Sequence, residues 1–210
     1  MRLFTLLLFS LFIIATANAQ QVKPIYFAGN VITADSTKAT SYAVYGKLST
    51  EELWSFKRYD LWDNLLQTGS FKDEELSIPH GKFTYYMSVE YFNTLTNNFF
   101  YIKDKHRFIS QIGSFENGKE TGNWYTFYPD GSVFVTVKFT NGLMNGEYKS
   151  YTRKGVLESS GNYVDGKKNG EWMFHSGLQI DVYEMDELKS SLKSKKLIRK
   201  ESRAAALNNE

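Results

Sequence analysis

The sequence predicts an all-β protein, an antiparallel meander of repeated β-hairpins that ends in a short, basic, helical or disordered tail. Three observations predict this class. Glycines recur every 24 residues in the second half of the chain, aromatic residues accompany them at constant offsets, and β-branched residues alternate between them. The 210 residues include no cysteine, so an elongated sheet of this kind has no disulfide to hold it together.

Residues 1–19 have the pattern of a signal peptide. Arg2 precedes a mainly apolar run from Leu3 to Ala15, and Ala17-Asn18-Ala19 is a small-x-small sequence that signal peptidase accepts. A helix over this run reaches only ~20 Å, which is too short for the ~30 Å hydrocarbon core of a membrane. We therefore expect cleavage near Ala19 and export to the periplasm or out of the cell. The lack of cysteine favours a bacterial envelope over a disulfide-built extracellular setting.

Residues 20–108 are predicted to hold N-terminal strands and degenerate repeat units. The motif Leu65-x-x-x-Gly69-x-Phe71 returns at residues 109–115 and 157–163, and residues 81–86 resemble residues 122–127. Residues 54–64 fit the closing half of a first unit. The spacing of 44 residues between Gly69 and Gly113 indicates one unit with an insertion.

Residues 109–180 contain three repeats of about 24 residues. An Asn-Gly or Asp-Gly pair starts each repeat, a second glycine follows four residues later, and an aromatic residue stands two residues beyond it. A further glycine closes the first two repeats at the same offset. The repeat-defining residues are Gly118, Gly122, Trp124, Gly131, Gly142, Gly146, Tyr148, Gly155, Gly166, Gly170 and Trp172.

One repeat reads as two strands and two turns. Val133, Val135, Val137 and Phe139 alternate with period two, as the buried face of a strand does. The Asn-Gly pair at 141–142 is typical of a tight hairpin turn, because glycine accepts a positive φ and asparagine tolerates it. Residues 146–152 are the return strand, and a turn at residue 155 follows. Repetition of this unit predicts ten to twelve strands.

Aromatic residues are expected to form two ladders across the sheet. Phe71, Phe115, Phe139 and Tyr163 recur on one strand type, and Phe83, Trp124, Tyr148 and Trp172 recur on the other. Packing between neighbouring strands is the favoured interpretation, because a thin repetitive sheet has little else from which to build a core. The alternative is an exposed platform on which sugars or peptides stack.

The cycle NGxxxGxWxxYxxxG, with Gly122–Gly131 as its clearest copy, resembles the MORN repeat, and more closely its bacterial variant. Proteins of that variant family are often exported and are commonly labelled as the antitoxin component of a YwqK-type toxin–antitoxin system. The resemblance covers residues 109–177 well and extends weakly to residues 54–86 and 25–45. It implies the same meander fold and no catalytic residues.

The charge is divided between the body and the tail. Residues 20–188 carry 17 Lys and Arg against 21 Asp and Glu, a net charge of −4, whereas residues 189–210 carry seven against two, a net of +5. The predicted tail, residues 181–210, contains helix formers and a candidate interaction set: Lys193, Lys195, Lys196, Arg199 and Lys200. A solvated extension is the favoured interpretation, and an arm that binds an anionic membrane surface is the alternative.

The sequence predicts no catalytic, cofactor-binding or metal-binding residues. His80, His106 and His175 are far apart, and the acidic run Asp73–Glu75 lacks the pattern of a calcium loop. A pair of catalytic carboxylates of the glycosidase type is a remote alternative. Nucleic acid is not an expected partner, since no aromatic residue lies among the basic ones of the tail.

The predicted function is therefore that of a non-catalytic protein-interaction or scaffold module of the bacterial envelope, with a protein as its partner. An antitoxin role and association with a membrane surface remain as alternatives. An enzyme acting on envelope glycans is a further and weaker one.

Overall fold

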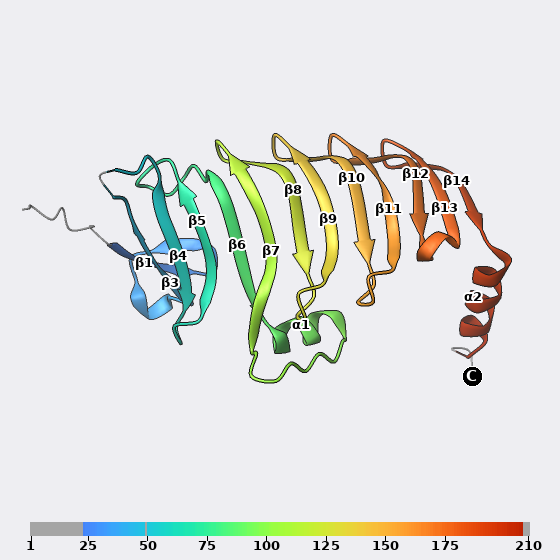
Figure 1. Cartoon of the computed structure of the whole chain (residues 1–210), viewed down its shortest axis with the longest axis horizontal. Coiled ribbons are helices and arrows are strands. Elements are labelled where there is room, and N and C mark those ends of the chain that lie inside the picture. Colours follow the sequence, from blue (N-terminus) through green and yellow to red (C-terminus); the bar gives the residue numbers. More distant parts are fainter. Residues whose placement is uncertain (1–22, 49, 208–210) are drawn as a thin grey trace, which may run out of the picture.

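The computed structural model describes residues 23–48 and 50–207, which form one antiparallel sheet of 14 strands and two α-helices (Figure 1). The predicted signal peptide, residues 1–19, lies outside the described residues. From β3 to β14 each strand pairs with the next one along the chain, so the predicted hairpin meander is confirmed.

The strands are short and their bounds follow the predicted repeats closely. They are β1 (Lys23–Ala28), β2 (Val31–Thr33), β3 (Ser41–Gly46), β4 (Trp54–Asp60), β5 (Leu65–Phe71), β6 (Gly81–Ser88), β7 (Arg107–Glu116), β8 (Lys119–Phe127), β9 (Val133–Thr140), β10 (Leu143–Tyr151), β11 (Leu157–Val164), β12 (Lys167–Phe174), β13 (Gln179–Glu184) and β14 (Glu187–Lys193). The helices are α1 (Val89–Thr96) and α2 (Lys195–Leu207), and two 3-10 turns lie at Ser36–Lys38 and His175–Gly177.

The sheet has 14 strands, two more than the upper end of the predicted range, and the C-terminal hairpin accounts for the difference. Its turn is Met185-Asp186, which has positive φ angles of 50° and 73° but no glycine, so the turn was not visible in the sequence pattern. In the predicted tail, residues 181–210, a helix begins only at Lys195, because residues 187–193 complete the sheet as β14.

Neighbouring hairpins are linked by hydrogen bonds between their turns. At the upper edge in Figure 1, Gly118 N–H donates to Pro79 O at 2.9 Å, Gly142 N–H to Glu120 O at 2.9 Å, and Gly166 N–H to Met144 O at 2.8 Å. The last hairpin repeats the contact from Asp186 N–H to Lys168 O, at 2.8 Å. The 24-residue period therefore couples each repeat to the one before it.

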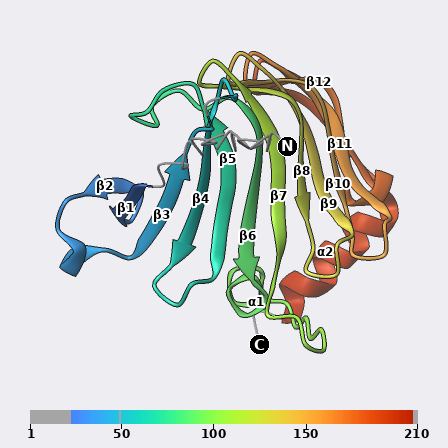
Figure 2. The same ribbon diagram turned by 60° about the vertical axis from the view of Figure 1, so that its left-hand side comes forward.

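The second glycine of each repeat bends its strand. Gly122, Gly146 and Gly170 have positive φ angles of 67°, 116° and 77°, and the strand register shifts where each of them lies. A glycine at such a bulge accepts a backbone conformation that other residues rarely adopt. Figure 2 shows the result, strands that bow and a sheet that curls.

The two predicted aromatic ladders merge into rows of touching rings on one face, which we call the ladder face. Ring centroids lie 5.5 Å apart for Phe71–Phe83, 4.8 Å for Phe83–Phe115 and 5.2 Å for Phe115–Trp124. A second row joins Tyr148, Tyr163 and Trp172 at 5.9 Å and 4.9 Å. Phe83, Trp124 and Trp172 are buried, so the rings pack the sheet.

The predicted insertion consists of α1 and the loop 97–106, between β6 and β7. It has a small core of its own, in which Phe92 contacts Phe100, Phe108 and Tyr128 with ring centroids 5.5 to 6.1 Å apart. Ser88 caps α1 by accepting a hydrogen bond from Tyr91 N–H at 3.1 Å. We call residues 89–106 the inserted lobe.

Candidate functional site

The repeat-defining residues lie in the turns and in the packed rows of the sheet. Gly118, Gly142 and Gly166 lie in the upper turns, and Gly131 and Gly155 lie in the turns of the opposite edge. Trp124 and Trp172 are buried and Tyr148 is half-buried. The buried tryptophans offer no open face on which a sugar or peptide could stack.

The inserted lobe and α2 project from the same long edge of the sheet, which we call the lower edge (Figure 1). The topology requires this arrangement. The even-numbered strands from β4 to β14 all run in the same direction, because an odd-numbered strand lies between each two of them and is antiparallel to both. Helix α1 follows β6 and α2 follows β14, so both helices start where even-numbered strands end.

Large apolar side chains are exposed along this edge. Phe99 is 92% exposed and Tyr101 89%, both in the inserted lobe, and Trp62, at the tip of the β4–β5 hairpin, is 80% exposed. Tyr91 and Leu95 on α1 are also exposed. We call these five residues the aromatic edge. Large apolar surface of this kind commonly marks an interaction site.

Hydrogen bonds and a cation–π contact fix the loop of the inserted lobe that carries Phe99 and Tyr101. The Asn93 side chain accepts a hydrogen bond from Phe100 N–H at 2.8 Å and donates one to Phe100 O at 2.9 Å, which ties the loop to α1. Arg153 lies 4.3 Å from the centre of the Phe100 ring and donates to Asp130 at 3.0 Å. A cavity of about 790 Å³ lies between α1 and the returning loop.

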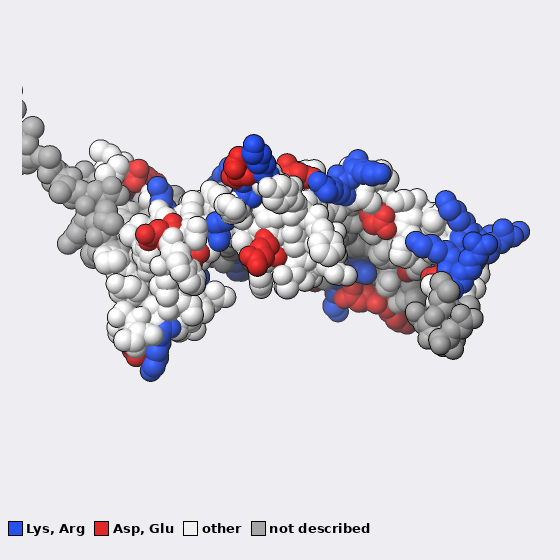
Figure 3. All heavy atoms as spheres, turned by 90° about the horizontal axis from the view of Figure 1, so that it is seen from below, with Lys and Arg blue, Asp and Glu red and all other residues white. Residues whose placement is uncertain are grey.

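Helix α2 carries most of the predicted interaction tail on one exposed face. Lys196, Arg199, Lys200 and Arg203 follow the spacing i, i+3, i+4, i+7, and Lys195 lies beside them. All five are exposed and have no ion pair with another described residue. Figure 3 views the molecule from the lower edge and shows Lys and Arg side chains, in blue, gathered at the end of the molecule where α2 lies. We call these five residues the basic stripe.

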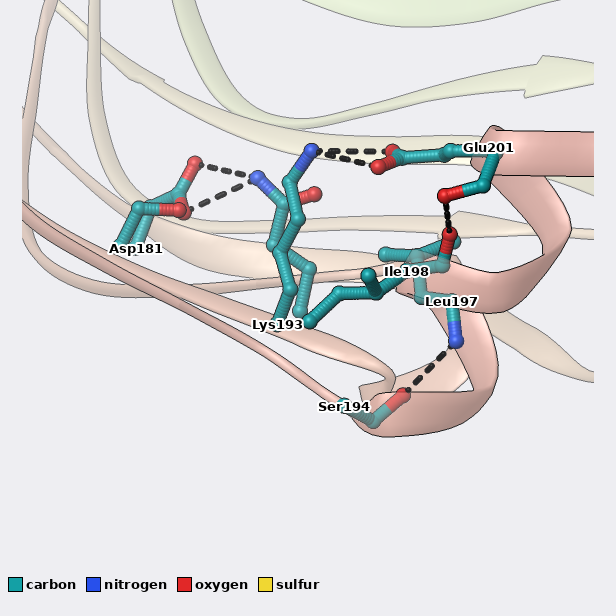
Figure 4. A network of polar contacts seen from close by, with 9 residues as sticks. Asp181, Lys193, Ser194, Leu197, Ile198 and Glu201 are labelled. Carbon is teal, nitrogen blue, oxygen red and sulfur yellow. Dashed lines mark hydrogen bonds and ion pairs between the residues drawn. The ribbon is translucent and has the colours of Figure 1, made fainter. Parts of the chain in front are cut away.

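Lys193 belongs to the sheet and not to the stripe. From β14 it makes an ion pair with Glu201 of α2, at 2.9 and 3.0 Å to the two carboxylate oxygens (Figure 4). Ser194 Oγ accepts a hydrogen bond from Leu197 N–H at 3.3 Å, as an N-cap residue does, and Leu197 is buried. The helix thus attaches through one face and presents the stripe on the other.

Asp181, on β13, forms hydrogen bonds within β13 and to β14, close to the place where α2 attaches to the sheet. It is buried and accepts hydrogen bonds from Ser191 at 2.6 Å, from Gln179 at 3.0 Å and from Tyr183 at 3.4 Å. Burial alone would raise the pKa of Asp181, but these hydrogen bonds and the positive charge of Lys168 outweigh it. The pKa of Asp181 therefore lies below its ordinary value.

The other polar residues considered from the sequence have local partners. His80 Nδ1 accepts from Asn117 N–H at 3.3 Å, His175 lies 3.6 Å from Glu158, and Asp73 caps its own loop by accepting from Ser77 and Ile78. Within the described residues there is no group of three or more His, Cys, Asp and Glu side chains placed to hold a metal ion. No helix in the described part of the chain is long and apolar enough to cross a membrane.

No protein-family model, curated protein or solved structure matches this chain. The relationship to the MORN-repeat variant family therefore stays a prediction. The aromatic edge was not predicted from the sequence, which singled out the repeated aromatics. The break in the period between Gly69 and Gly113 was the available signal, since insertions in repeat proteins often carry the binding residues.

Proposed function

We propose that this protein is a non-catalytic, exported module that binds another protein in the bacterial cell envelope and acts there as a scaffold. The observation that carries the proposal is the aromatic edge, where Trp62, Phe99 and Tyr101 are 80 to 92% exposed. Tryptophan and tyrosine are enriched among the residues that dominate the energy of protein interfaces. Burial of these rings against a partner would remove a large apolar area from water.

The sheet supports this role by holding the aromatic edge rigidly. Turn-to-turn hydrogen bonds connect the hairpins, and the lobe is pinned between Ser88 and Arg107, which are directly paired across β6 and β7. A surface fixed before binding loses little conformational entropy when its partner arrives.

In-cell photo-cross-linking tests the proposal. A photoreactive phenylalanine analogue in place of Phe99 or Tyr101 is expected to capture one and the same protein. The analogue in place of Tyr26, which is an exposed aromatic residue at the β1–β2 end, is the matched control and should not capture it. Capture of no specific protein at either lobe position, or equal capture at the control, would contradict the proposal.

The basic stripe favours a second candidate function, association with an anionic membrane surface. Five exposed cations on one helical face attract anionic headgroups, and the contribution of each weakens as salt rises. Because the stripe and the aromatic edge share the lower edge, a membrane under α2 would also face the lobe.

Vesicle flotation tests this second candidate. Replacing Lys196, Arg199, Lys200 and Arg203 by Gln should abolish flotation with vesicles that contain phosphatidylglycerol. The control replaces four exposed lysines of the sheet, Lys57, Lys82, Lys119 and Lys138, by Gln and makes the same change in net charge. If both variants lose flotation equally, net charge and not the stripe is responsible.

A further inference from the structure

A cavity of about 480 Å³ opens on the sheet face opposite the ladder face, where β6, β7 and β8 approach the lower edge. Its walls are largely apolar and include Tyr86, Ile109, Ile112 and Phe127. Two cations, Lys105 and Arg107, also line it. The volume lies within the range of about 300 to 1,000 Å³ that is usual for small-molecule sites.

Arg107 lacks close acceptors for its guanidinium. Its nearest carboxylate oxygen, Asp60 Oδ2, lies 3.7 Å from Nη1, and its hydrogen bond to Tyr86 O is 3.5 Å long. The buried Nε has no acceptor among the described residues. Arg153, by contrast, donates from Nε to Asp130 Oδ2 at 3.0 Å. A largely covered guanidinium with such distant partners is an incompletely paired charge, because good hydrogen bonds to oxygen are about 2.7 to 3.2 Å long.

The Asp60 carboxylate is already hydrogen-bonded within the β4–β5 turn. Its Oδ1 accepts from Trp62 N–H at 3.0 Å and from Asn64 N–H at 2.9 Å, and its Oδ2 accepts from Asn64 Nδ2 at 2.9 Å. These bonds hold the β4–β5 turn and keep the carboxylate away from the guanidinium fork. Lys105 is fixed beside the cavity by donating to Pro129 O at 3.0 Å, and it adds a second positive charge.

We propose that this cavity binds an amphipathic carboxylate, a single carboxylate group attached to an acyl chain or an aryl ring. The carboxylate accepts hydrogen bonds from the Nη1 and Nη2 fork of Arg107, a geometry that matches the guanidinium. The apolar part lies on Ile109, Ile112 and Phe127 and covers surface that water now contacts. None of the residues that line the cavity belongs to the aromatic edge or to the basic stripe.

Isothermal titration with sodium decanoate tests the proposal, and decanol and decyltrimethylammonium serve as ligands with the same chain but another head. The protein should bind decanoate and bind the other two at least tenfold more weakly. Arg107→Met should weaken decanoate binding by tenfold or more, the range expected for a lost hydrogen bond to a charged group. Arg107→Lys keeps the charge without the fork and should give an intermediate affinity.

Two further variants distinguish the proposal from a general loss of structure. Asp60→Asn retains a side-chain oxygen for the turn and removes the competing charge, so it should strengthen decanoate binding. Arg58→Met removes an arginine of β4 that donates to Ser41 Oγ at 2.9 Å and does not line this cavity, so it should leave decanoate binding unchanged. The proposal is overturned if the unaltered protein does not bind decanoate at millimolar concentration, if decanol binds equally well, or if Asp60→Asn and Arg107→Met weaken binding alike.

Discussion

Individual glycines on the ladder face leave room for the large rings of the neighbouring strand. A Cβ atom built on Gly161 would lie 2.2 Å from Trp172 Cδ2, and one on Gly113 would lie 2.0 Å from Trp124 Cδ2. In the repeat between them, Val137 stands where the other repeats have this glycine, and it pairs with Tyr148. The larger valine is therefore matched with a ring that is smaller than that of tryptophan. The glycine of the Leu-x-x-x-Gly motif is thus set by packing, since its own φ is not positive.

This packing predicts a large effect of one methyl group. Gly161→Ala should lower the free energy of unfolding by about 1 to 3 kcal/mol, because the added Cβ displaces the Trp172 ring from its buried position. Urea denaturation followed by tryptophan fluorescence measures the change. Gly155→Ala is the control, because its Cβ would enter open space and its φ of 75° costs only about 1 kcal/mol. Equal losses in the two variants would contradict the packing argument.

The stability of the C-terminal strands β13 and β14 is expected to depend on pH through Asp181. Because the pKa of Asp181 is lowered in the folded protein, its contribution to stability is complete above the ordinary value of 3.8 and is lost as the pH falls through the folded value. We expect the protection factors of amides in β13 and β14, corrected for the intrinsic exchange rate, to fall on acidification below about pH 4. Asp181→Asn should remove that fall relative to β3 and β4. An unchanged pH profile in the variant would show that another carboxyl is responsible.

Among the four short turns that follow β7, β9, β11 and β13, the last one is the least favourable. Asn117, Asn141 and Asp165 occupy the first turn position of the repeats, where φ is 52°, 52° and 48°, whereas Met185 occupies it in the β13–β14 hairpin at 50°. Asparagine tolerates this left-handed conformation better than an unbranched apolar side chain does.

Met185→Asn is therefore expected to stabilise the protein by about 0.5 to 1 kcal/mol, the usual gain from a residue suited to its backbone conformation. Thermal denaturation followed by circular dichroism measures it as a raised Tm. Asp165→Asn exchanges two residues that both suit the position and should leave Tm unchanged. A lower Tm for Met185→Asn would mean that the methionine side chain, 40% exposed, contributes more by packing than its conformation costs.

At the scale of the whole molecule, each described strand pairs only with the strands directly beside it in the sheet, so stability should be distributed along one dimension. Trp172→Ala should remove about 3 to 5 kcal/mol from the packing of its own region. Hydrogen exchange should then show lost protection in β11, β12 and β13 and retained protection in β3, β4 and β5. A uniform loss along the chain would show that the sheet unfolds as a single unit.

Residues 109–177 show which parts of the fold can be predicted from local sequence patterns. The Asn-Gly and Asp-Gly pairs predicted the upper turns and the alternation of Val133 to Phe139 predicted a strand, because turn chemistry and side-chain periodicity are properties of adjacent residues. The Met185-Asp186 turn and the start of α2 were not predicted, since that hairpin closes through its pairing with β12 and not through a glycine.

The sequence by itself determined the all-β class, the 24-residue hairpin unit and the aromatic rows, because period and turn type are encoded within each repeat. Only the tertiary structure decided which aromatic residues are buried and which are exposed, since burial depends on the strand that lies alongside. It also brought the inserted lobe and α2 to one edge and placed Arg107 beside an apolar cavity, 3.7 Å from its nearest carboxylate oxygen. These arrangements depend on strands paired across the sheet, and no local run of residues specifies them.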